Sequence, residues 1–126
     1  ARRGLGVELR APGRSVGAVV QYVAYEAQAR LGGERRIILL AEDALARAPY
    51  QPIRVISAEY WPLPWYLRGL PSVEYRFTPG DDCDGALVFA SMENADAVRA
   101  KLRRTYRESI LGLRPGVVCI VFTLEP

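Results

Sequence analysis

Residues 86–124 read ALVFASMENADAVRAKLRRTYRESILGLRPGVVCIVFTL, and three patterns follow one another within them. The continuous apolar run at 86–89 predicts a buried strand. The segment 94–105 predicts an amphipathic helix, because its apolar positions recur at helical spacing. Those positions are Ala95, Val98 and Leu102.

The end of this stretch predicts an antiparallel hairpin. Two segments of strand character, 106–113 and 117–124, flank Arg114-Pro115-Gly116. A Pro-Gly pair suits the tight turn that joins two antiparallel strands. Strand, helix and hairpin in this order indicate a sheet covered by helices.

Upstream segments extend the same alternation. A helix is predicted from Ser15 to Leu31, ended by Gly32-Gly33, since apolar residues recur in its sequence at helical spacing. Strands are predicted at 37–40, 53–56 and 73–77, the first because four apolar residues are consecutive. We therefore predict an α/β fold: a mixed β-sheet packed by about three helices, with a C-terminal antiparallel hairpin.

Length and composition fit one such domain. The chain has 126 residues, of which 50% are hydrophobic and 25% charged, so it can bury a core without metal or disulfide staples. It contains no His, which excludes His-based acid–base catalysis and Ser-His or Cys-His nucleophiles. Because it begins at Ala1 without an initiator Met, we expect residues 1–126 to be one soluble domain of a longer protein.

The two cysteines, Cys83 and Cys119, lie far apart in the sequence and form no C-x-x-C motif. Cys119 lies in an apolar run, which favours a buried, inert thiol. A disulfide between the two is left open by the sequence.

The charge balance raises the question of nucleic acid. The net charge is +3, and basic residues are densest in 99–107. These residues also form the polar side of the predicted 94–105 helix, which is the ordinary solvated face of such a helix. We predict no nucleic-acid partner.

Both tryptophans of the chain fall in 60–68, which reads YWPLPWYLR. Pro62 and Pro64 suit the first turn of a helix that we expect to run to about residue 70. On a helical wheel, the side chains of this predicted helix form two opposite stripes. Leu63, Tyr66, Leu67 and Leu70 form an aliphatic-rich stripe, and Trp61, Trp65 and Arg68 form the opposite one. The second stripe is either core or a binding surface, since Trp and Arg dominate binding hot spots.

Residues 61–75, WPLPWYLRGLPSVEY, resemble the soluble C-terminal domain of multi-pass membrane proteins of the dolichyl-phosphate-mannose mannosyltransferase-like group, which are GT-C-type glycosyltransferases. The resemblance extends to the segments 84–88 and 112–117, in the same order. Gly69 departs from the pattern, which usually has an acidic residue there.

The resemblance implies a non-catalytic accessory domain. In that group the catalytic carboxylate lies in the membrane portion and the donor is a polyprenyl-phosphate sugar, so we expect no catalytic residue and no cofactor here. The implied partners are the membrane-embedded portion of the same chain and a polyprenyl-phosphate sugar or glycan acceptor. Tyr60, Trp61, Trp65 and Arg68 are the candidate binding residues, on the extracytoplasmic side of the membrane.

Three alternative functions stay open. Asp82-x-Asp84 mimics the acidic pair that holds a divalent metal in other glycosyltransferases, but it also suits a solvated turn. Glu42-Asp43 follows the predicted 37–40 strand, where α/β folds often carry catalytic residues, so an enzyme such as a hydrolase that uses carboxylates alone is a second alternative. A small-ligand-binding or regulatory module would have a pocket at the strand ends, lined by Tyr60, Trp61 and Trp65.

Overall fold

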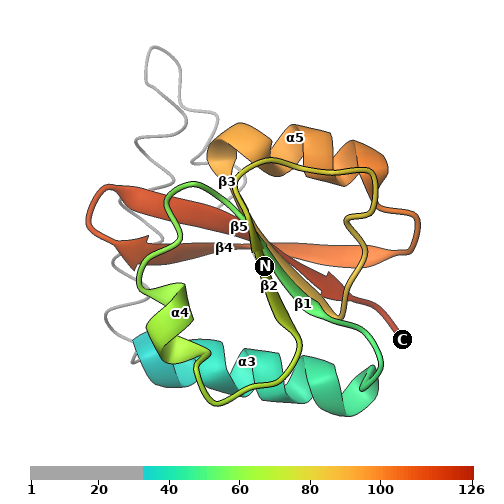
Figure 1. The fold of residues 1–126 in the computed structure, drawn as a ribbon, viewed down its shortest axis with the longest axis horizontal. Coiled ribbons are helices and arrows are strands. Elements are labelled where there is room, and N and C mark those ends of the chain that lie inside the picture. The colour runs from blue at the N-terminus through green and yellow to red at the C-terminus, as the bar shows by residue number, and fades with distance from the viewer. Residues whose placement is uncertain (1–32) are drawn as a thin grey trace.

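The computed structural model describes residues 33–126, which form one five-stranded sheet with helices on both faces (Figure 1). The helices are α3 (Gly33–Arg47), α4 (Leu63–Tyr66) and α5 (Met92–Lys101). The strands are β1 (Ile53–Ile56), β2 (Val73–Arg76), β3 (Leu87–Ser91), β4 (Tyr106–Arg114) and β5 (Val117–Leu124). The predicted mixed sheet with a C-terminal hairpin is confirmed. The helix predicted at 15–31 lies outside the described residues.

Strand order in the sheet is β2-β1-β3-β5-β4. The first three strands are parallel, with Ile53 in register with Val73 on one side and with Leu87 on the other. β5 runs antiparallel to both β3 and β4. Helices α3 and α4 cover one face and α5 covers the opposite face (Figure 1).

The prediction of a strand at 37–40 is wrong, because these residues lie inside α3. Ile37, Ala41 and Ala44 are buried against the sheet at helical spacing, whereas Leu39 is half exposed. A short continuous apolar run fits a buried strand and a helix segment equally well, and only its flanks distinguish the two. Here the flanks are Glu- and Arg-rich helix formers, and the helix continues through them.

The other two predicted helices are shorter than expected. α4 covers only Leu63–Tyr66, and its carboxyl end closes when the Leu67 N–H donates to the carbonyl of Leu63 at 2.9 Å. α5 starts earlier, after the Ser91 side chain accepts from the N–H of Asn94 at 3.2 Å, and ends before Leu102. Ser91 is thus a conventional N-cap, three residues before the predicted helix start at residue 94.

The sheet separates two apolar clusters. The larger one joins α3 and α4 to the sheet and includes Ile37, Leu67 and Phe89; the smaller one lies under α5 and includes Val98 and Phe122. No described helix is long and apolar enough to cross a membrane.

Both cysteines are buried and free. Burial raises the pKa of Cys119 to about 12. Burial also raises the pKa of Cys83, although Arg76, Lys101 and Arg54 act in the opposite direction. The prediction of a buried Cys119 thiol is confirmed, and the open question of a disulfide is answered by two free thiols.

Candidate functional site

The segment around α4 divides its side chains between core and surface. Leu63 and Leu67 are buried in the cluster shared with α3. Trp61 and Trp65, in contrast, are 57% and 53% exposed. Arg68 is also exposed, with 53% of its side chain accessible. All three residues of the predicted second stripe are therefore at the surface, a point that the sequence left undecided, but they do not form one helix face, because only Trp65 lies within α4.

Arg68 is held against Trp65. Its guanidinium carbon lies 3.8 Å from the centroid of the indole ring, within the range of a cation–π contact. Its Nη1 donates to the Trp65 carbonyl at 2.6 Å and lies 3.8 Å from a carboxylate oxygen of Glu34 on α3. The guanidinium thus lies over the indole of a half-exposed tryptophan and brings positive charge to the surface beside it.

Trp61 is anchored through its backbone. Nη1 of Arg114, at the end of β4, donates to the Trp61 carbonyl at 2.6 Å, and Nη2 pairs with Glu59 at the same distance. These contacts tie the loop before α4 to the hairpin turn. The backbone that carries the Trp61 indole is therefore held in place by Arg114, which contacts both Trp61 and Glu59.

Three further aromatic residues extend this surface. Tyr60 lies with its ring centroid 5.5 Å from Tyr75 and 6.2 Å from Phe77, and its ring is nearly parallel to that of Phe77. Tyr75 and Phe77 are 37% and 65% exposed. Burial against these neighbours, with the nearby Tyr60 hydroxyl, raises the pKa of Tyr75, so the phenol stays uncharged.

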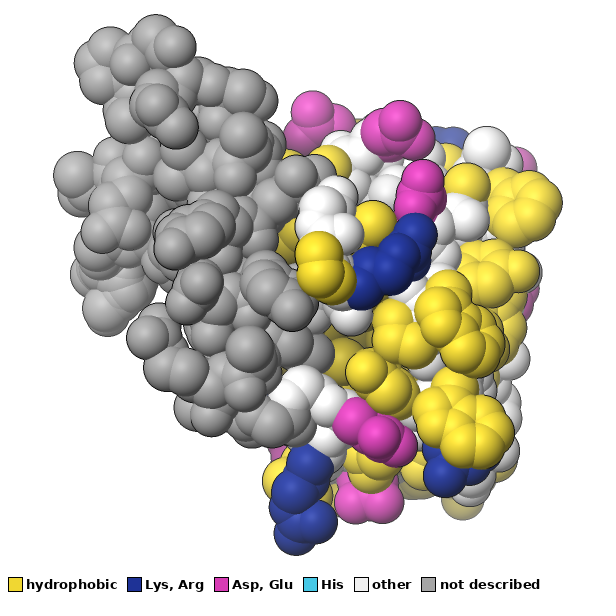
Figure 2. Space-filling model, turned by 90° about the vertical axis from the view of Figure 1, so that its left-hand side faces the viewer, with side chains coloured by type: hydrophobic (Ala, Val, Ile, Leu, Met, Phe, Trp, Pro, Cys, Tyr) yellow, Lys and Arg dark blue, Asp and Glu magenta, His cyan; other side chains and the backbone are white. Residues whose placement is uncertain are grey.

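We call this surface the aromatic face. Figure 2 shows hydrophobic side chains gathered in a band over this side of the molecule, with few charged groups among them. Aromatic rings with one polar end, beside an arginine, provide large contact area at low conformational cost. The members of the aromatic face are Tyr60, Trp61, Trp65, Arg68, Tyr75 and Phe77.

The acidic turn at 81–84 is engaged with the rest of the fold. Asp82 pairs with Nη2 of Arg54 at 3.1 Å. Asp84 accepts from the backbone N–H of Arg103 at 3.1 Å and from the hydroxyl of Tyr106 at 3.1 Å. The two carboxylates therefore serve different partners, and within residues 33–126 no group of three or more metal-ligating side chains comes together.

Arg54 is the centre of a charge network on β1. It is 9% exposed, pairs with Glu74 on β2, and its Nε donates to the Asp84 carbonyl at 2.5 Å. Burial opposes ionisation of Glu74, but hydrogen bonds from Arg54 and Arg76 outweigh it and hold the pKa of Glu74 below its ordinary value. These contacts fix the crossover from β2 to β3 on the α5 side of the sheet.

The basic strip of 99–107 also has internal partners. Arg99 forms a two-pronged pair with Glu108, at 2.7 and 2.9 Å, and contacts Asp96 at 2.6 Å. Lys101 donates to the Gly80 carbonyl at 3.0 Å. Two of the cations that a phosphate backbone would need are thus already committed within the fold.

Glu42 and Asp43 do not follow a strand, because the predicted strand is helix. Both lie on the exposed side of α3, where Asp43 pairs with Arg47 one turn later at 3.0 Å. The structural premise for an active site at these carboxylates is therefore wrong.

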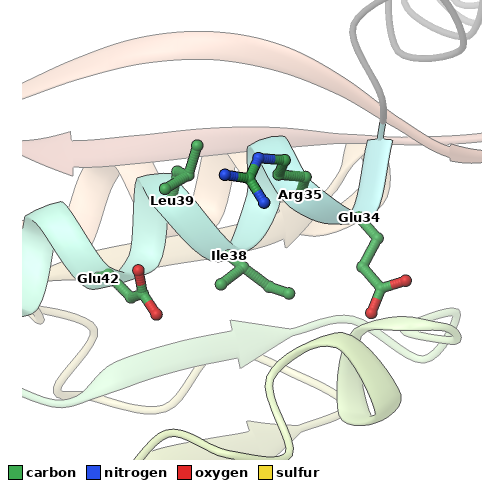
Figure 3. A pocket seen from close by; sticks show the side chains of 5 residues that line it. All are labelled: Glu34, Arg35, Ile38, Leu39 and Glu42. Atoms are coloured by element: carbon green, nitrogen blue, oxygen red, sulfur yellow. The ribbon is translucent and has the colours of Figure 1, made fainter.

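A hollow of about 590 Å³ lies against α3. Its described wall is a single helix face that carries two carboxylates, one guanidinium and two aliphatic side chains (Figure 3). The residues are Glu34, Arg35, Ile38, Leu39 and Glu42. This wall brings together no nucleophile with a base among the described residues.

A smaller hollow, of about 240 Å³, lies at the ends of β1 and β3. This is the position predicted for a ligand pocket, but its described lining comes from other residues than Tyr60, Trp61 and Trp65. Sequence analysis also missed Tyr75 and Phe77 as members of the aromatic face. The alternation of 73–77 gave no signal for this, since it places the apolar residues Val73, Tyr75 and Phe77 on the buried side of a strand.

No protein-family model, curated protein or solved structure matches the chain.

Proposed function

We propose that this domain is a non-catalytic accessory domain that docks through its aromatic face. Its partner, in this proposal, is the membrane-embedded portion of a polyprenyl-phosphate-sugar-dependent glycosyltransferase, to which the domain belongs. There it would stabilise the membrane part or help shape its substrate site, on the extracytoplasmic side. The identity of the partner comes from the resemblance of residues 61–75.

The observation that carries the proposal is the exposure of two tryptophans, Trp61 just before α4 and Trp65 within it. Large aromatic side chains dominate the energetics of cores and interfaces, and a group of them left at the surface typically marks a contact site. Trp and Tyr are also enriched where proteins meet the headgroup level of a bilayer, because their rings are amphipathic. Arg68 adds a cation suited to phosphate or carboxylate groups at such a boundary.

The first experiment is made on the native gene product. Its size is determined, and its retention in the membrane fraction is measured after alkaline carbonate washing. Retention of a chain much larger than 126 residues is the expected result. A small product released by the wash would overturn the proposal.

A crosslinking experiment tests the docking surface itself. A photoreactive amino acid replaces Trp65 in the native product, and the matched control replaces Arg107, an exposed residue on β4. Crosslinks from position 65, but not from 107, should reach peptides of the membrane portion. Equal crosslinking from both positions, or none from 65, would contradict docking through the aromatic face.

A further inference from the structure

The hollow at the ends of β1 and β3 lies where the chain leaves the sheet in two directions. After β1 the chain passes to α4 on one face, and after β3 it enters α5 on the opposite face (Figure 1). Adjacent parallel strands whose connections part in this way form a crevice at their carboxyl ends, which is the usual ligand position in open α/β sheets. The lining is Ser57, Ala58, Glu59, Ser91, Met92, Glu93, Gly116, Val117 and Val118.

Two serines supply hydrogen-bond donors to this lining. The Ser57 residue is 3% exposed, and its Oγ accepts from the N–H of Glu59 at 2.9 Å. Ser91 Oγ accepts from the N–H of Asn94 at 3.2 Å. A hydroxyl also carries one proton to donate, and neither proton has a recorded acceptor within residues 33–126. Each hydroxyl oxygen is therefore held in place by the backbone N–H that it accepts, and its proton is left to donate to a ligand.

The first turn of α5 adds backbone donors. The N–H groups of Met92 and Glu93 have no partner within the helix, as at any helix start, whereas Ser91 satisfies the N–H of Asn94. Both residues line the hollow. This wall therefore favours a ligand that presents oxygen acceptors.

The two carboxylates in the lining, Glu59 and Glu93, indicate whether the hollow suits an anionic or a neutral ligand. Glu59 is neutralised by Arg114 at 2.6 Å, but Glu93 is exposed and has no described cationic partner. The unpaired carboxylate repels a phosphate or a carboxylate at short range. It accepts hydrogen bonds from hydroxyl groups, which a neutral ligand with several of them provides.

We propose that this hollow binds one neutral sugar ring, with Ser57, Ser91 and the first turn of α5 donating to its oxygens and Glu93 accepting from its hydroxyls. A volume of about 240 Å³ lies below that of pockets for drug-sized ligands, which suits a single ring rather than a longer glycan. The inference goes beyond the accessory role above and does not depend on the aromatic face.

The test is a titration of the isotope-labelled chain, followed by amide chemical shifts in NMR spectra. The probes are methyl glycosides of glucose, mannose, galactose and N-acetylglucosamine, each raised to high millimolar concentration because a single ring buries little surface. At least one should shift the amides of Ser57, Ser91, Met92 and Glu93 saturably. Inorganic phosphate should leave them unshifted.

Several results would overturn the inference. They are unshifted amides with all four glycosides, shifts caused by phosphate rather than by sugar, and sugar-induced shifts confined to the aromatic face. Trp65→Ala should leave the sugar titration unchanged, so failure here is distinguishable from failure of the docking proposal.

Variants of the lining sharpen the test. Glu93→Ala changes an exposed side chain and should weaken sugar binding about tenfold, as expected for loss of hydrogen bonds to a charged group. The control Glu125→Ala, at an exposed glutamate outside the lining, should leave the dissociation constant unchanged. Ser57→Ala should act in the same direction as Glu93→Ala. Unchanged binding in Glu93→Ala would contradict the assigned site.

Discussion

The carboxylate of Asp82 lies 3.1 Å from Nη2 of Arg54, although 28 residues separate the two in the sequence. Arg54 is nearly buried in the central part of the sheet, whereas Asp82 lies in an exposed turn. A buried guanidinium requires compensation of its charge, and this turn helps supply it. The acidic turn therefore has a structural role that its sequence, rich in Asp, did not disclose.

The same network predicts a pH dependence. The pKa of Glu74 is held below its ordinary value, so its ionised form stabilises the folded state above about pH 4.5, and this contribution is lost as the pH falls through the lowered pKa. Urea unfolding between about pH 6 and 3 should show a free energy of unfolding that falls with acid. Glu74→Gln should flatten that fall. Parallel curves for the parent and the variant would contradict the prediction.

Gly85 should tolerate no side chain. A Cβ there would lie 2.5 Å from the carbonyl oxygen of Pro52, which also accepts the N–H of Ala86 at 2.8 Å. Gly85→Ala should therefore lower the free energy of unfolding by about 1–3 kcal/mol, measured by urea denaturation. The matched control is Gly69→Ala, where nothing lies within 4 Å, and it should be neutral or slightly stabilising. Equal effects at the two glycines would show that the close contact is absent.

The two sides of α4 should respond differently to truncation. Leu67→Ala removes a buried side chain and should cost about 2–5 kcal/mol of unfolding free energy. Trp65→Ala removes a half-exposed ring and its contact with Arg68, which should cost only about 1 kcal/mol. Denaturant curves of the two variants measure the difference. A larger loss in Trp65→Ala than in Leu67→Ala would assign the tryptophan to the core.

Both thiols should be unreactive in the folded chain. Cys83 and Cys119 are buried, and burial raises the pKa of each above its ordinary value, so little thiolate exists at neutral pH. A thiol-specific chromogenic reagent should react only slowly with the native protein. Once urea has unfolded the chain, the same reagent should react with both cysteines. Rapid native labelling, or failure to label both thiols in urea without a reductant, would contradict the two free buried thiols.

The sequence was sufficient for the features that depend on local pattern. The strand at 53–56 and the hairpin of 106–113 and 117–124, with its Pro-Gly turn, were predicted from the sequence, and the structure confirms both, with the first hairpin strand extended to Arg114. Helical spacing also separated Leu63 and Leu67, which are buried, from Trp61, Trp65 and Arg68, although α4 has only four residues and the sequence did not decide that the second group is exposed.

Features that depend on packing between distant segments were not predictable. The run at 37–40 became helix because its flanking residues continue α3, and periodicity within four residues could not decide this. The hollow at the strand ends brings Ser57 beside Ser91 and the hairpin turn, which needs the strand order that the sequence does not state. The aromatic face likewise gains Phe77 only because β2 pairs with β1.

The position of β1 between two later strands has a consequence for how the sheet is assembled. Both neighbours of β1, namely β2 and β3, come later in the chain, and β3 in turn needs β5 on its other side. During synthesis, which proceeds from the N-terminus, residues 53–56 therefore have no pairing partner until the strand at 73–76 has emerged, and their other edge stays unpaired until the strand at 87–91 follows. The β4–β5 hairpin, by contrast, closes between neighbouring segments with little loop entropy. The last strand to be made, β5, is thus the one that covers the second edge of β3. A nascent chain stopped before β5 would leave that apolar edge exposed.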